Sequence, residues 1–69
     1  MQISARNQLR GTVKSVTLGA VMAEVVVALP DGQEIVSAIT RASAESMNLQ
    51  PGDQVVAIIK STEVIVGKD

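Results

Sequence analysis

The sequence contains no cysteine, no histidine and no phenylalanine, tyrosine or tryptophan. Without cysteine and histidine, the chain can form neither disulfides nor the usual structural zinc sites. The missing histidine also removes the side chain that most often acts as a general acid or base, and the missing aromatics remove the platforms on which single-stranded nucleic acids stack. A chain of 69 residues builds only a small core, so we expect partner subunits to supplement it.

An excess of charge of one sign and long apolar runs are absent as well. Six basic and seven acidic residues give a net charge of −1, which favours neither nucleic acid nor an anionic membrane. No apolar run is longer than that of residues 25–29, which is far too short to span a bilayer, and the first residues lack the regions of a signal peptide. We therefore predict a cytoplasmic protein without membrane or nucleic-acid partners.

Five segments have the composition and alternation of β-strands. They are rich in β-branched residues and comprise residues 8–18, 21–29, 34–39, 54–60 and 63–66. In the first segment the apolar side changes near Ser15, which predicts a bulge there. In the second segment both faces are apolar and only Glu24 interrupts one of them, so we expect cover on both sides, with another subunit providing the second.

Local signals also predict the connections. Pro30, Asp31 and Gly32 favour a tight turn between the second and third strands. After Thr40, which can cap a helix, residues 41–47 have helical spacing, and Pro51 prevents continuation. The predicted fold is therefore all-β, a five-stranded OB-fold-like barrel with one short helix between strands three and four. An SH3-like barrel is the alternative.

The residues that catalysis would need are missing or scattered. The seven carboxylates are spread singly along the chain, and the six serines have no histidine to activate them. The five glycines are isolated from one another, so no phosphate-binding loop is present. We predict that the protein is not an enzyme.

Three short segments are rich in hydrogen-bond donors and contain no carboxylate: residues 4–7, 40–43 and 60–62. An ionised oxyanion accepts hydrogen bonds only, so hydroxyls, backbone N–H groups and cationic side chains are the groups that bind it. The second segment also opens the predicted helix, whose free N–H groups favour an anion. Each segment alone has a simpler interpretation: a helix cap at Thr40 and Ser43, a solvated Arg6, and a turn at Lys60 and Ser61.

Longer stretches of the sequence resemble a known family. The opening ISARNQL followed by GTV, the stretch GAVMAEV, the pair Ile39 and Thr40 with Ser43, LQPGD and IKSTEV are similar to the molybdate-binding Mop domain of the molbindin family, a TOBE-like family. The resemblance covers nearly all of residues 1–69 as a single Mop domain. Gln2 departs from the serine common in close relatives, and Arg41 is variable there.

The resemblance implies molybdate, or possibly tungstate, as the bound ligand and molybdenum storage as the role. It also implies a free-standing homo-oligomer, a hexamer built as a trimer of dimers, with the oxyanion held between subunits. The family's contacts fall on Ser4, Ala5 through its backbone, Arg6, Thr40, Ser43, Lys60 and Ser61. Because one barrel need not bring all of these together, we expect residues 4–6 to come from a neighbouring subunit. A molybdopterin ligand is a less favoured possibility.

Two other functions stay open at this point. The chain is a small protein-interaction or regulatory module if its apolar faces bind a partner protein and the polar segments serve only as caps. It is a nucleic-acid-binding OB domain if it binds single strands in a salt-sensitive way, which the missing aromatics disfavour.

Overall fold

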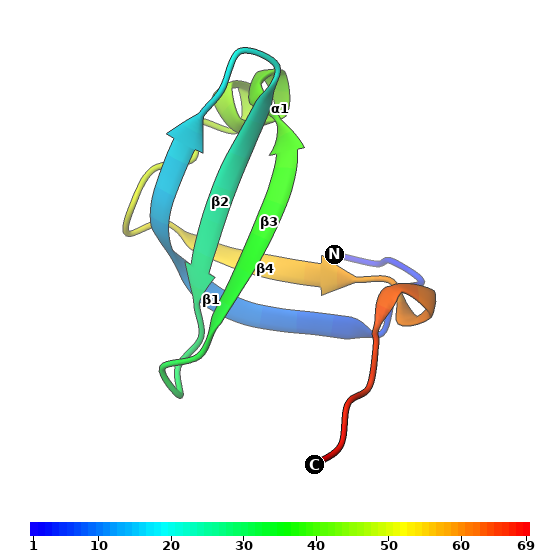
Figure 1. Cartoon of the computed structure of the whole chain (residues 1–69). Coiled ribbons are helices and arrows are strands. Elements are labelled where there is room, and N and C mark those ends of the chain that lie inside the picture. The colour runs from blue at the N-terminus through cyan, green and yellow to red at the C-terminus, as the bar shows by residue number, and fades with distance from the viewer.

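A computed structural model describes all residues of the chain, 1–69, as one curled antiparallel sheet with a short helix at one end (Figure 1). The elements are β1 (Asn7–Leu18), β2 (Met22–Ala28), β3 (Glu34–Thr40), α1 (Arg41–Ser46), β4 (Gln54–Ile59) and the 3₁₀ helix η1 (Ser61–Glu63). The strand order is β3-β2-β1-β4, with all neighbours antiparallel. The first four predicted strands and the predicted helix are thus confirmed within one or two residues at each end.

Strand β1 is the longest, with 12 residues, and belongs to both halves of the curled sheet. Its first part, residues 7–12, pairs with β4, and its later part, residues 12–18, pairs with β2. The pairing with β2 shifts between Val13 and Ser15, so Lys14 is the extra residue of a bulge, as the sequence predicted. A bulge bends a strand and increases its twist, which lets one strand serve two differently oriented partners.

The turn between β2 and β3 confirms the prediction from its residues. Gly32 has a φ of 91°, which glycine adopts without strain, and its N–H donates to the Leu29 carbonyl at 3.0 Å. The Asp31 carboxylate accepts hydrogen bonds from the side-chain amide and the backbone N–H of Gln33. These bonds, the side-chain one first, lower the pKa of Asp31 below its ordinary value of 3.8.

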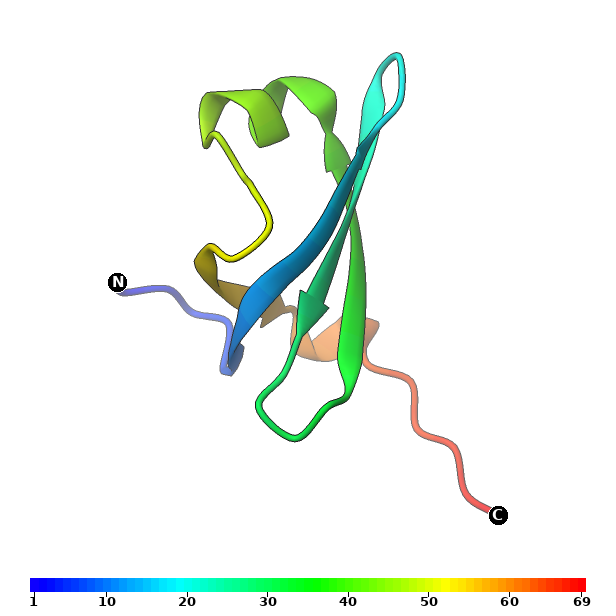
Figure 2. The same cartoon turned by 90° about the vertical axis from the view of Figure 1, so that its left-hand side faces the viewer.

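The core lies on the concave face of the sheet. Its buried centre comprises Val13, Val25 and Val27, and the surrounding half-buried side chains are Val16, Ile39, Leu49 and Val55. Helix α1 covers one end of this face and buries Ala44 (Figure 2). Asn48 ends the helical segment with a φ of 49°, and the Leu49 N–H donates to the Ala44 carbonyl at 3.1 Å.

The predicted fifth strand is wrong for the chain taken alone. Residues 61–63 form η1, and residues 64–69 continue without any strand pairing. The composition of this segment favours a strand, but a strand also needs a free sheet edge beside it, and the segment leaves the body of the molecule instead (Figure 1).

The second face of β2 is less covered than its first face. Ala23, Val25 and Val27 are buried, whereas Met22 on the opposite face is 48% exposed and Val26 is half-buried. The single chain thus supplies one of the two covers that the sequence predicts. None of its helices has the length and apolar composition needed to cross a membrane.

Candidate functional site

Two of the three donor-rich segments meet at one end of the sheet. Asn7 at the start of β1 pairs with Ile59 at the end of β4, and the two strands are antiparallel. Arg6 and Lys60 are the next residues outward, so both leave the sheet at the same end, and Ser61 follows as the first residue of η1. In Figure 1 the segment before β1 and the turn of η1 lie at this end.

The chain before β1 is held by a contact that sequence reasoning missed. The side-chain amide of Gln8 donates to the Ala5 carbonyl at 2.8 Å. This bond turns the chain back at residues 4–6, while Ser4 and Arg6 stay exposed and Ala5 is half-buried. The available signal was a glutamine three residues after the carbonyl that it binds, a spacing suited to a local side-chain to backbone bond.

The charges at this end are not engaged within the chain. The two ion pairs of the structure join Lys14 to Glu34 and Arg41 to Glu45, so Arg6 and Lys60 take part in neither. No residue of the chain competes for these two cations by an ion pair. Together with the hydroxyls of Ser4 and Ser61, they form a group of donors at one end of β1 and β4, here named the β1–β4 donor cluster.

The third donor segment lies at the other end of the sheet. Thr40 pairs with Met22 at the start of β2, next to the end of β1. The 12 residues of β1 separate this position from the β1–β4 donor cluster, and α1 and η1 lie well apart in both views of the chain (Figures 1 and 2). A single chain therefore does not bring Thr40 and Ser43 to the other predicted site residues.

Thr40 and Ser43 are engaged with each other. The Thr40 hydroxyl accepts from the Ser43 N–H at 3.1 Å and donates to the Ser43 hydroxyl at 2.8 Å. Thr40 is thus the N-cap of α1, which was the simpler interpretation of this segment. The hydroxyl proton of Ser43 remains free to donate. The Arg41 guanidinium already donates to Glu45 and to the Gly19 carbonyl, each at 3.2 Å.

None of the seven predicted residues is enclosed by the chain. Ser4, Arg6, Thr40, Ser43, Lys60 and Ser61 are exposed, and Ala5 is half-buried. The larger of the two main cavities is an apolar groove on the concave face, and the other lies beside Arg10 and Gln54, so neither is lined by a predicted residue. No cluster of carboxylates suited to a metal ion is present. An anion held here by one chain would stay in water, where such contacts are weak.

Comparison with known proteins places this chain in a family. Residues 3–66 match the family model described as the TOBE domain. The chain belongs to the TOBE-domain family. Relatives of the chain include proteins named for molybdenum or molybdate. Their names agree with the resemblance to the molybdate-binding Mop domain that the sequence motifs suggested.

Three relatives define the similarity. The molybdenum-pterin-binding protein MopA of Rhodobacter capsulatus is 52% identical over 66 residues, which are 96% of this chain and 25% of MopA. A molybdate-binding protein from Sporomusa ovata is 47% identical, with a TM-score of 0.92 over 99% of this chain and 100% of that one. The cytoplasmic molybdate-binding protein ModG, solved with molybdate bound, is 46% identical, with a TM-score of 0.90 over 94% of this chain and 46% of ModG.

These comparisons settle the architecture of the TOBE-domain chain. The curled four-stranded sheet with its helix is an OB-like half-barrel, as predicted, and not the SH3-like alternative. The chain spans about a quarter of MopA and nearly half of ModG, so those proteins contain further sequence beside this domain.

Proposed function

We propose that this protein binds a tetrahedral oxyanion, molybdate in the first place, between copies of the chain. The observation that carries the proposal is the β1–β4 donor cluster, in which two cations without ion-pair partners lie beside two serine hydroxyls at one end of the sheet. The names of the Sporomusa ovata protein and of ModG support molybdate as the ligand. The backbone N–H of Ala5 completes the donor set.

The donor set fits a dianion that accepts hydrogen bonds and donates none. Arg6 offers a planar array of N–H donors, and Lys60 offers an ammonium point charge. Such charge-assisted bonds are about twice as strong as neutral ones, provided that water is kept away. Since the cluster is exposed in one chain, a second chain is needed to cover it.

Thr40 and Ser43 then belong to a different copy from the β1–β4 donor cluster. The sequence suggested that only residues 4–6 come from the neighbouring subunit. The pairing of β1 with β4 instead puts Lys60 and Ser61 at the same end of the same chain as residues 4–6. We accordingly propose a homo-oligomer, a hexamer arranged as a trimer of dimers, in which residues 1–69 act as one Mop domain. Storage of molybdenum in the cytoplasm is the corresponding role, in line with the description of ModG as cytoplasmic.

Calorimetric titration with molybdate tests the site directly. Arg6→Ala and Lys60→Ala each remove charge-assisted hydrogen bonds worth about 1.5–3 kcal/mol, so we expect the dissociation constant to rise roughly 10-fold to 100-fold in each variant. Lys14→Ala is the matched control, because it removes the same charge from a residue that is paired with Glu34 instead. The control variant is expected to titrate like the original chain.

Unchanged affinity in both Arg6→Ala and Lys60→Ala, with native mass preserved, would refute the assignment. Sulfate as a competitor measures selectivity for the larger oxyanion, and tungstate titrated in parallel measures whether the site distinguishes two dianions that present the same acceptors. Absence of any binding heat in the original chain would remove the oxyanion function and favour a protein-interaction module.

Other ligands and roles remain secondary proposals. The name of MopA supports a molybdenum-pterin, which the same titration tests with a pterin in place of molybdate. A binding role without catalysis and without nucleic acid stays our expectation, because no histidine, carboxylate cluster or aromatic surface is available for either.

A further inference from the structure

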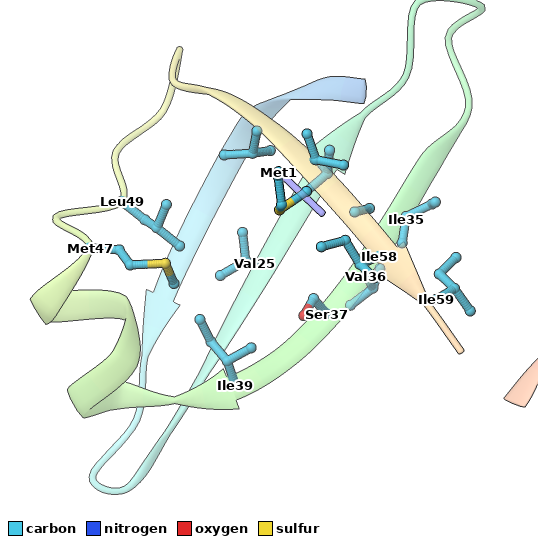
Figure 3. A pocket seen from close by; sticks show the side chains of 14 residues that line it. Met1, Val25, Ile35, Val36, Ser37, Ile39, Met47, Leu49, Ile58 and Ile59 are labelled. Carbon is cyan, nitrogen blue, oxygen red and sulfur yellow. The ribbon is translucent and has the colours of Figure 1, made fainter. Parts of the chain in front are cut away.

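The segment before β1, residues 1–6, is held to the body of the chain by few contacts. Met1 lines the apolar groove on the concave face, among side chains of β2, β3 and β4 (Figure 3), but it is 80% exposed and so holds the segment only loosely. The side-chain amide of Gln8 donates to the Ala5 carbonyl, and no other hydrogen bond involves residues 1–6. Gln8 therefore determines the path of residues 4–6.

Gln8 can hold this segment because its own backbone is fixed. It lies in β1 and pairs with Ile58 of β4, next to the pair of Asn7 with Ile59 that ends the ladder. A side chain on a paired strand positions its neighbours more precisely than one on a loop. Without such a contact, a chain end of this kind frays. The bond thus extends the order of the sheet to residues 4–6.

The bond also controls a hydrogen-bond acceptor beside the proposed site. In the sequence, Ala5 lies between Ser4 and Arg6, two members of the β1–β4 donor cluster, and its carbonyl oxygen can only accept hydrogen bonds. A carbonyl directed at a dianion repels it. Because the Gln8 amide donates to this oxygen at 2.8 Å, it keeps the oxygen directed toward β1 and offsets its partial negative charge.

The same bond fixes the direction of the next backbone donor. In a planar trans peptide, the carbonyl of one residue and the N–H of the following residue point in opposite directions, and the chain has no cis peptide. The Arg6 N–H consequently points away from Gln8, and it donates to no group of the chain. It is therefore free beside the Arg6 guanidinium, which takes part in no ion pair.

We propose that Gln8 is a positioning residue of the oxyanion site. Its amide keeps the Ala5 carbonyl away from the ligand and so presents the Arg6 N–H to it, while Gln8 itself does not touch the ligand. The inference rests on the proposed function and adds to it a residue of β1 that sets the affinity. The alternative is that the Gln8 bond only stabilises the end of the sheet.

Molybdate titration of three variants tests the proposal. Gln8→Ala removes the donor, and we expect the dissociation constant to rise roughly 3-fold to 10-fold. Gln8→Glu puts a carboxylate in place of the donor, which repels both the carbonyl and the dianion, so a rise of about 10-fold or more is expected. Gln54→Ala is the matched control, because the Gln54 amide donates to the Thr12 hydroxyl at 3.0 Å at the other end of the same strand pair. Its dissociation constant is expected to stay within about twofold of the original.

Nuclear magnetic resonance provides a measurement that a merely structural bond would not change. In the absence of molybdate, the order parameter of the Arg6 N–H is expected to be about 0.8 in the original chain and in Gln54→Ala, and to fall below about 0.6 in Gln8→Ala. With saturating molybdate, hydrogen exchange at the Arg6 N–H is expected to slow on the order of 10-fold in the original chain and clearly less in Gln8→Ala.

Several results would overturn the positioning role. Among them are an unchanged molybdate affinity in Gln8→Ala, an equal loss in Gln8→Ala and Gln54→Ala, and an Arg6 N–H that molybdate does not protect. A lower native mass in Gln8→Ala would show that the bond supports assembly instead, and would overturn it as well. If the original chain gave no binding heat, the proposed function and the positioning role would both fail. Molybdate binding that Arg6→Ala weakens and Gln8→Ala leaves unchanged would remove the positioning role alone.

Discussion

Gly11 marks the position where β1 passes from its pairing with β4 to its pairing with β2, and we predict that it tolerates no side chain. It pairs with Val55 on β4, and it is buried. A Cβ atom placed on it would lie 2.6 Å from the Ala28 carbonyl oxygen and 2.6 Å from Cγ1 of Val27. Both distances are far below van der Waals contact. The carbonyl belongs to the backbone of a neighbouring strand, so it cannot rotate away.

The expected cost of Gly11→Ala follows from these two contacts. Overpacking of a buried site costs about 1–3 kcal/mol, and a backbone contact places this substitution in the upper part of that range. The smaller entropy of the unfolded chain offsets about 0.4–1 kcal/mol. The net loss is therefore about 2 kcal/mol, which for a domain of this size lowers the melting temperature by roughly 8–16 °C.

Thermal unfolding followed by circular dichroism measures this loss, with the protein concentration held constant because assembly also affects the melting temperature. Gly67→Ala is the matched control. A Cβ at Gly67 meets nothing within 4 Å, so the control is expected to change stability by less than about 0.5 kcal/mol. If Gly11→Ala melted within about 2 °C of the original chain, the strands would have separated at little cost and the reasoning would be wrong.

Two further substitutions test local features of the fold. Thr40→Ala removes the N-cap bond to the Ser43 N–H and is expected to cost about 1 kcal/mol in urea unfolding, whereas Thr40→Ser keeps the hydroxyl and is expected to lose little. Asp31 has a folded-state pKa below 3.8, so the stability it contributes is present above pH 3.8 and is lost as the pH falls through that lower pKa. Asp31→Asn is therefore expected to be less stable than the original chain above pH 3.8, and this difference in the free energy of unfolding is expected to shrink as the pH falls. A difference that stays constant over this range would argue against the turn bonds as the cause.

Most of the fold could be predicted because its signals are local. Alternation located the strands, and proline with glycine located the turn before β3. The change of the apolar side predicted a bulge near Ser15, and the structure identifies the neighbouring Lys14 as the extra residue. The close approach at Gly11 could not be predicted, since it depends on where β2 crosses β1. The fifth segment shows the same limit: its composition favours a strand, but composition does not say whether a free sheet edge lies beside it.

The candidate site, like the fold, could be predicted only in part. Donor chemistry alone selected the three segments, because an oxyanion leaves few other side chains suitable. Their grouping depended on the pairing of Asn7 with Ile59, a contact between residues far apart in sequence. Thr40 shows that one residue can satisfy two interpretations, since its hydroxyl caps α1 and the Ser43 proton beside it stays free.

The proposed oxyanion site links ligand binding to assembly. In a single chain Lys60 and Ser61 are exposed, so the β1–β4 donor cluster stays in water. A second copy that covers the cluster would supply the desolvation that strong charge-assisted bonds require. By linkage, an oxyanion that binds only the assembled form would stabilise assembly, by about 2.7 kcal/mol at a hundred times its dissociation constant. Native mass measured with and without molybdate is therefore expected to show a more stable oligomer when the ligand is present, and an oligomer whose stability is independent of molybdate would argue against a site between copies.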